Sequence, residues 1–182
     1  MIAWRFGDLA TNRLSDPGQL SNIILAALAG SEVPQAFATE VAGISRVGPY
    51  WALPGPRHEK IAESEIYFRG DESAVEESLN SRHLEDYDTS LRLAPLDRAL
   101  ATGIASISLV RMQLSKHGEF RPFSFRLSAT EYEAEPAVWP VVLTFSRYRG
   151  PQDDFGPHFR VEPQSNDQGA PDTRSFEFYA LL

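Results

Sequence analysis

The segment "RHLEDYD", residues 82–88, gathers four side chains of the types that bind divalent metals: His83, Glu85, Asp86 and Asp88. Their spacing is unfavourable. A strand would place His83 and Glu85 on one face and the two aspartates on the other, and a helix would contain no His-Glu-x-x-His arrangement. We therefore expect an acidic loop here, and a metal-dependent hydrolase or nuclease is kept as an alternative.

A second chemical candidate is the pair His58 and Glu59 in "PRHEK", which could act as general acid and base if the fold placed them in a pocket. His117 and His158 lie in turn-like sequences, where histidine is commonly tolerant of unusual backbone. The chain contains no Gly-x-Ser-x-Gly elbow, phosphate-binding loop or dinucleotide fingerprint. The absence of these motifs disfavours an enzyme, and we expect no catalytic residue, metal or cofactor.

The composition narrows the functional classes further. The 182 residues carry a formal net charge of −8, which opposes charge-driven attraction to nucleic acid or anionic membranes. Without cysteine there are no disulfides, thiolate metal sites or cysteine nucleophiles. The longest apolar run, residues 23–29, is far shorter than the ~20 residues of a membrane-spanning helix. A signal peptide over residues 1–31 is less favoured than a helix start at "SDPGQ". We expect a cytoplasmic protein without a membrane partner.

The charges are distributed unevenly along the chain. Residues 59–88 hold ten acids against three bases, whereas residues 104–149 hold six bases against four acids. Five of those six are arginines: Arg111, Arg121, Arg126, Arg147 and Arg149. Arginine makes the bidentate contacts and aromatic stacks that phosphate and base recognition use. An arginine-bearing sheet face is therefore a candidate RNA- or DNA-binding surface, with Arg121, Arg126, Arg147 and Arg149 as its contacts.

The stretch "EFRPFSFRLSATEY", residues 119–132, tests that idea because it sets arginines between phenylalanines. Its alternation predicts a strand whose phenylalanines face the core and whose arginines face water. A four-stranded RNA-binding sheet instead needs outward-facing aromatics with basic and glycine residues at set spacing, and that pattern is missing. A solvated sheet face is the favoured interpretation.

Periodicity and capping signals predict the first half of the fold. Residues 2–6 alternate like a strand, and residues 16–30 carry an N-cap, an apolar stripe and a closing glycine. A second helix is expected from Pro34 to about Arg46, completing a helical hairpin, with Phe37, Val41 and Ile44 facing inward. A short strand over residues 65–70 and an acidic helix over 73–80 follow, the latter with capping-box spacing between Ser73 and Glu76.

The second half is predicted to be rich in strands. Pro95 can open a helix to about Ala105, after which "SISLVRMQL" fits either a continued helical stripe or a strand. We favour a strand over Ser106–Leu114, paired as a hairpin with the strand that follows. Further strands are expected from residue 141 to about 149 and from 175 to 182, separated by a long surface loop around 150–173 in which only "HFRVE" has a strand pattern. These elements predict one α+β domain spanning 1–182, an antiparallel sheet with helices on one face.

Residues 48–56, "GPYWALPGP", combine five glycines and prolines, which disfavour regular structure, with large apolar side chains. Such a loop either packs down or binds a partner. Together with the acidic segment 59–88 it favours a non-catalytic binding protein that acts through a protein–protein interface, such as an adaptor, an inhibitor or immunity-type partner, or an assembly component. The expected partner is another protein, and nucleic acid is the alternative. Interfaces favour tyrosine and tryptophan, so the candidate anchors are Tyr50, Trp51, Tyr67 and Tyr87.

Overall fold

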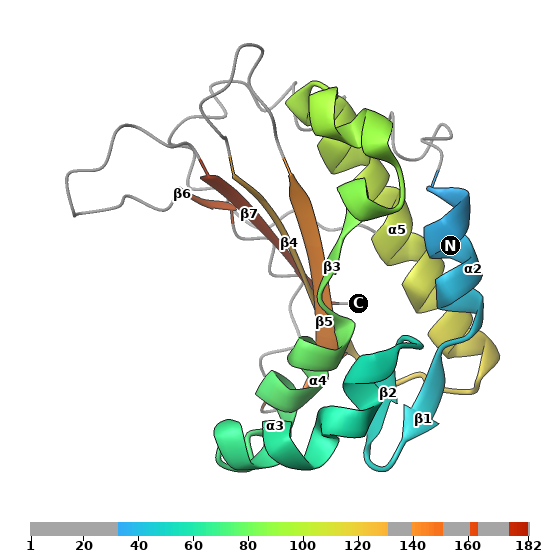
Figure 1. Ribbon diagram of the computed structural model, residues 1–182, viewed down its shortest axis with the longest axis vertical. Helices are drawn as coiled ribbons and strands as arrows, with labels where there is room; N and C mark the ends of the chain where they lie inside the picture. The colour runs from blue at the N-terminus through green and yellow to red at the C-terminus, as the bar shows by residue number, and fades with distance from the viewer. Residues whose placement is uncertain (1–32, 131–139, 151–160, 164–174, 182) are drawn as a thin grey trace.

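The computed structural model describes residues 33–130, 140–150, 161–163 and 175–181, and it has an α+β architecture (Figure 1). The helices are α2 (Gln35–Ala42), α3 (Ile61–Tyr67), α4 (Glu72–Asn80) and α5 (Leu96–Lys116), with shorter 3-10 turns at Pro56–Lys60, Leu84–Asp86 and Thr89–Leu93. The strands are β1 (Ser45–Val47), β2 (Tyr50–Ala52), β3 (Arg82–His83), β4 (Phe123–Thr130), β5 (Val141–Arg147), β6 (Val161–Pro163) and β7 (Ser175–Leu181). The predicted α+β class is confirmed.

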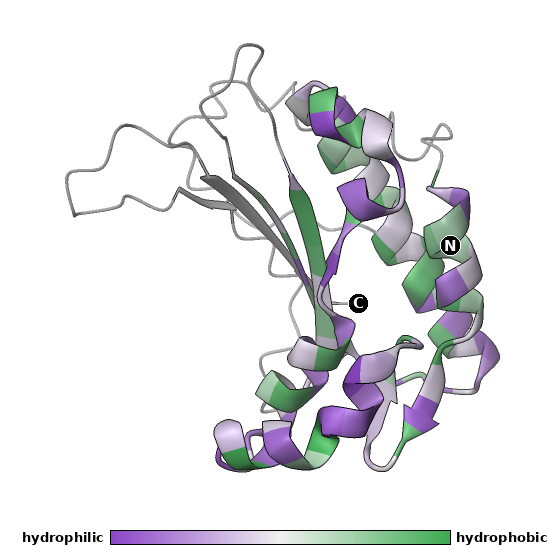
Figure 2. Ribbon diagram, in the orientation of Figure 1, coloured by the Kyte–Doolittle hydropathy of each residue, from purple (hydrophilic) through white to green (hydrophobic). Residues whose placement is uncertain are grey.

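The main sheet is antiparallel throughout and has the strand order β3-β5-β4-β7-β6. β1 and β2 form a separate hairpin. α5 packs against β4 and β5, α2 packs against α5, and Figure 1 shows both helices on the same side of the sheet. Figure 2 shows β5 as a largely hydrophobic strand, in agreement with its central place in the core. In the described ranges, no helix has the length and apolar character that a membrane crossing requires.

The predicted alternation in β4 is confirmed. Phe123, Phe125 and Leu127 are fully buried, whereas Ser124 and Arg126 between them are partly exposed. Phe120 departs from the prediction, because it precedes the strand and its side chain is 74% exposed. The arginine-and-phenylalanine pattern is therefore a half-buried strand with one additional aromatic side chain left in water.

The strand predicted over Ser106–Leu114 is wrong, because α5 continues unbroken to Lys116. Its buried side chains at Leu100, Ile104 and Ile107 follow the helical stripe across the predicted boundary. Ser108 Oγ donates to the Ile104 carbonyl at 3.2 Å and Ser115 Oγ donates to the Arg111 carbonyl at 3.0 Å, so these two hydroxyls bond within the helix. The buried Ser106 Oγ, by contrast, has no hydrogen-bond partner among the described residues. The first residue that suits a helix end is Gly118, at φ 75°. The hairpin proposed for this segment is accordingly absent from the described residues.

Three other boundaries needed correction. α2 ends at Ala42 rather than near Arg46, because the chain turns back into the β1–β2 hairpin, where the positive φ of Gly48 forms the turn. Thus part of the 48–56 segment is regular after all. The strand predicted over 65–70 is wrong, since α3 occupies those residues up to Tyr67. The acidic helix is confirmed as α4, but its N-cap is Asp71, whose carboxylate accepts from the Ser73 and Ala74 amides.

The strands predicted near residues 141–149 and 175–182 are confirmed as β5 and β7. Within the long segment 150–173, the structure describes Gly150 and β6. The strand expected over 2–6, the helix expected over 16–30 and therefore the helical hairpin lie outside the described residues.

Candidate interaction surface

Two buried polar side chains of α4 fix the position of the β1–β2 hairpin. Glu76 is fully buried and accepts from the Trp51 amide at 2.7 Å, the Arg147 amide at 2.7 Å and Arg149 Nη1 at 2.8 Å. Asn80, also fully buried, accepts from the Leu53 amide at 2.9 Å and donates to the Trp51 carbonyl at 2.8 Å. Because these groups replace the hydrogen bonds that a neighbouring strand would supply, α4 joins the hairpin to β5.

Two of the predicted tyrosine and tryptophan anchors lie inside the fold. Tyr50 is 2% exposed and donates a 2.8 Å hydrogen bond to Glu65 Oε1, and Trp51 is 7% exposed and donates from Nε1 to Glu119 Oε2 at 3.0 Å. Burial, with a smaller effect of the hydrogen bond to Glu65, raises the pKa of Tyr50 to about 12. The segment 48–56 therefore packs against the rest of the fold. Tyr50 and Trp51 have little exposed surface left for a partner.

Tyr87 is half-buried. Its hydroxyl donates to Glu40, and its ring meets Phe37 edge-on with centroids 5.2 Å apart. Burial, reinforced by the hydrogen bond to Glu40, raises the pKa of Tyr87 well above its ordinary value. Arg82 Nε also donates to Glu40, at 2.7 Å, so that this carboxylate links α2 to the segment after α4. The Tyr87 hydroxyl is thus bound within the fold by Glu40, which Arg82 holds in place.

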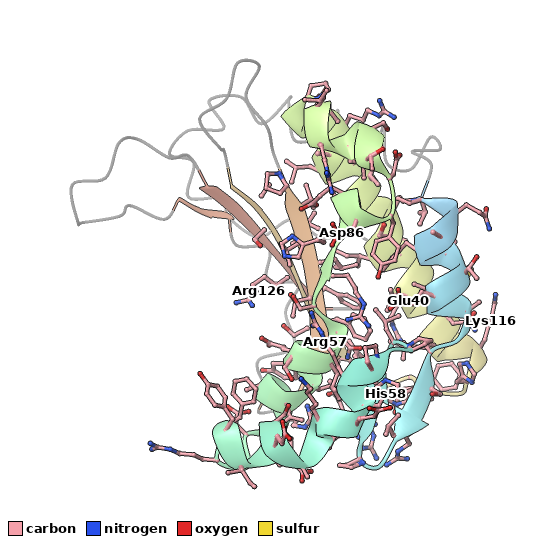
Figure 3. The ribbon with its side chains drawn as sticks, viewed as in Figure 1. Glu40, Arg57, His58, Asp86, Lys116 and Arg126 are labelled. Atoms are coloured by element: carbon pink, nitrogen blue, oxygen red, sulfur yellow. The ribbon has the colours of Figure 1, made fainter. Side chains whose placement is uncertain are left out.

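The four arginines proposed for nucleic-acid contact do not form one free surface. Arg147 pairs with Glu119 at 3.0 Å, and Arg149 pairs with Glu72 and Glu76. Arg126 lies 3.7 Å from Glu77 and points away from α2 and α5 (Figure 3). Arg121 is exposed, and within the described part of the chain no ion pair involves its guanidinium. Three of the four side chains are therefore engaged with acidic residues, two of them strongly.

Glu119 is the centre of a second polar cluster, near the end of α5. One carboxylate oxygen accepts from Trp51 and Arg147, and the other accepts from the Arg121 amide at 3.0 Å. Burial alone would raise the pKa of this carboxyl, but these hydrogen bonds and the Arg147 charge together lower it. Arg111 Nη1 donates to the Glu119 carbonyl at 2.9 Å, and burial lowers the pKa of that arginine.

The described histidines and acids considered for catalysis or metal binding make separate local contacts. His83 Nδ1 lies 2.9 Å from Glu85 Oε1, while Glu85 Oε2 accepts from the Val141 amide. Asp88 instead caps the following turn through the Ser90 amide. His58 Nε2 lies 2.7 Å from the Leu53 carbonyl. Across the ranges that the structure describes, no three His, Asp or Glu residues are grouped to hold a metal ion.

The remaining anchor, Tyr67, lies on an exposed apolar surface on α3. Ile66 is 80% exposed and Tyr67 is 79% exposed, and no residue of α3 is buried. The helix is held by Ile61 before this pair and Phe68 after it, which both pack on the small cluster formed by the side chains of Tyr50, Ala52, Val75 and Leu79. The anchoring leaves Ile66 and Tyr67 facing water. We call Glu63, Ile66 and Tyr67 the α3 surface.

Local packing limits the freedom of this surface. The Tyr67 ring meets Phe68 edge-on, with centroids 4.9 Å apart and an interplanar angle of 89°. Directly after it, Arg69 adopts φ 54°, which costs a non-glycine residue roughly 1–2 kcal/mol, and Gly70 follows at φ 79°. These two residues reverse the chain so that Asp71 can start α4. Tyr67 thus lies at the end of a short helix, directly before a tight reversal of the chain.

Acidic residues outnumber basic residues in the part of the chain that contains α3. Five exposed acids, against the two exposed cations Lys60 and Arg69, occupy residues 59–72: Glu59, Glu63, Glu65, Asp71 and Glu72. Glu63 lies three and four residues before Ile66 and Tyr67, a spacing that places it on the same side of the helix. Glu63 therefore places a carboxylate on the side of the exposed apolar pair, whereas Glu72 is paired with Arg149 and Asp71 caps α4.

Sequence reasoning selected Tyr67 but missed Ile66, Phe120 and Met112, which are 80%, 74% and 48% exposed. The error at Ile66 followed from reading residues 65–70 as a strand. A signal was present in "RGD": Gly70 suits a helix end, and Asp71 is a standard N-cap residue for the next helix.

A scan against protein-family models found no match, and neither did searches of curated proteins and of solved structures.

Proposed function

We propose that this chain is a non-catalytic binding protein that acts through a protein–protein interface centred on the α3 surface. The observation that carries the proposal is the exposure of Ile66 and Tyr67, 80% and 79%, side by side on a helix without buried residues. A large aliphatic and a large aromatic side chain in water cost free energy that a partner can recover by covering them. An adaptor, an inhibitor or immunity-type protein, or an assembly component would use such a surface.

The surroundings of Tyr67 support an anchoring role. Tyrosine is over-represented among residues whose truncation costs most in interfaces, and Tyr67 already rests against Phe68, which reduces the ordering cost on binding. The excess of acidic residues in this part of the chain would accelerate and orient the approach of a basic partner surface. We therefore expect a partner face with exposed apolar side chains flanked by lysine or arginine.

The test is affinity capture from the lysate of the protein's own host with three tagged forms: wild type, Tyr67→Ala and Leu93→Ala. Leu93 is a matched control because it is 68% exposed but belongs to the turn before α5. We expect one stoichiometric protein to be retained by wild type and Leu93→Ala and lost from Tyr67→Ala. Equal retention by all three forms would contradict the proposal. A nuclease-sensitive bound fraction would instead favour the arginine-based hypothesis.

A further inference from the structure

Two further large apolar side chains are exposed near the end of α5. Met112 is 48% exposed in the penultimate turn of the helix, and Phe120 is 74% exposed just beyond it. The chain folds back on the helix here: the Glu119 amide donates to the Leu114 carbonyl at 3.1 Å, and Arg111 donates to the Glu119 carbonyl. Residues 119 and 120 are therefore held against the last turns of α5.

The charge at this end of α5 is positive. Lys116 and Arg121 are exposed, and His117 is exposed between them. The nearby acid, Glu119, is not available as a counter-charge at the surface, because its carboxylate already accepts from Trp51, Arg147 and the Arg121 amide. We call Met112, Lys116, Phe120 and Arg121 the α5-end surface.

The two surfaces complement each other. Each contains two large apolar side chains, but acids predominate in the part of the chain around α3 and cations are exposed in the α5-end surface. In the common view of Figures 1 and 3, α3 lies at the lower left and Lys116 at the right-hand edge, so α3 and the end of α5 lie apart within one molecule. A contact between them therefore joins two molecules.

We propose that the partner of the α3 surface is a second copy of this chain, which docks its α5-end surface on it. This inference rests on the proposed function and names its partner. Because the contact joins two different surfaces, it is head-to-tail, so each copy keeps one surface free to continue a ring or a chain of molecules. The apolar contact is small and each copy carries a net charge of −8, so the association is weak and appears at high protein concentration.

The experiment is sedimentation velocity on three proteins: wild type, an α3 variant (Ile66→Ser, Tyr67→Ala) and an α5-end variant (Phe120→Ala, Arg121→Ser). Each variant retains one intact surface. Wild type should show species larger than a dimer as its concentration rises toward about 1 mM, the range of weak association constants. Each variant alone should remain monomeric, and their equimolar mixture should form a dimer that goes no further. Leu93→Ala should behave as wild type.

Each contrary result has a definite meaning. A wild type that stays monomeric at about 1 mM, or variants that still associate alone, would overturn the head-to-tail contact. A mixture that stays monomeric while wild type associates would show that the two surfaces do not meet each other. None of these results removes the proposed function, because loss of host-protein capture in Tyr67→Ala tests it separately. Circular dichroism melting of each variant confirms that its fold is intact.

Discussion

Substituting alanine for Gly103 tests how closely α5 approaches the sheet. A Cβ at this position would lie 2.5 Å from both methyl carbons of Leu127 and 3.0 Å from its Cγ. Rotation about the Cβ–Cγ bond of Leu127 would not remove the overlap, because Cγ itself is too close. Leu127 is fully buried in β4, so it can move only by displacing other core side chains.

Two opposing contributions decide the sign of the effect. Alanine is better than glycine in a helix interior by about 1 kcal/mol. Forcing an extra methyl group into a packed core costs about 1–3 kcal/mol. We therefore expect Gly103→Ala to lower the free energy of unfolding by about 1 kcal/mol. In a Leu127→Ala background the methyl enters vacated space, so the same change should raise it by about 1–2 kcal/mol through propensity and burial.

Urea unfolding followed by circular dichroism measures all four members of this cycle, with unchanged m-values as the check on two-state behaviour. Ala105→Gly, on the same helix, supplies the propensity contribution and should cost about 1 kcal/mol in both backgrounds. A Gly103→Ala protein that is more stable than wild type would refute the reasoning, since it would mean that Leu127 yields at little cost.

Four further predictions follow from the site. Glu76→Ala should lower the free energy of unfolding by about 3–5 kcal/mol in urea titrations, because it leaves the Trp51 and Arg147 amides without their acceptor and removes one of the two carboxylates paired with Arg149. Glu119 has a lowered pKa in the folded protein, so its stabilisation is complete above about pH 4.3, its unfolded value, and is lost as the pH falls through the folded pKa; melting curves of Glu119→Gln should be flatter than wild type in that acidic range, and a parallel pH profile would contradict this. The pKa of Tyr50 is raised to about 12, so the stability it contributes is present below about pH 10 and is lost as the pH rises through 12. Ultraviolet titration of tyrosinate should therefore show late titration that is reduced in Tyr50→Phe, while the late titration of Tyr87 remains. Trp51→Ala should cost about 3–5 kcal/mol of stability, whereas Tyr67→Ala should change it by less than about 0.5 kcal/mol, which thermal melting distinguishes directly.

The elements that could be predicted are those in which local pattern and burial agree. Phe123, Phe125 and Leu127 alternate with polar residues in sequence, and the sheet buries that same face. The helical stripe of α5 was also visible, but the β-branched residues around Ile107 suggested a strand. The structure resolves that conflict in favour of the helix, in which Leu100, Ile104 and Ile107 form one buried stripe.

The candidate surfaces were harder to predict because exposure depends on contacts distant in sequence. Ile66 faces water because Ile61 and Phe68 are the residues that α3 places on the cluster around Tyr50. A seven-residue helix is too short for its periodicity to reveal which side is buried. Conversely, Trp51 looks like a loop residue free to bind, and only the partners of its indole and backbone, supplied from residues 76, 80 and 119, show that it is structural.

The bonds from α4 to β2 also protect the protein against aggregation. A two-stranded hairpin has outward-facing amides and carbonyls that can recruit a strand from another molecule. On β2, the side chains of Glu76 and Asn80 occupy the Trp51 amide, the Trp51 carbonyl and the Leu53 amide. The Asn80 amide group both accepts and donates, as a peptide unit of a neighbouring strand would. Aspartate at position 80 is nearly the same size but cannot donate when ionised, so that change would leave the Trp51 carbonyl on this edge without its hydrogen bond.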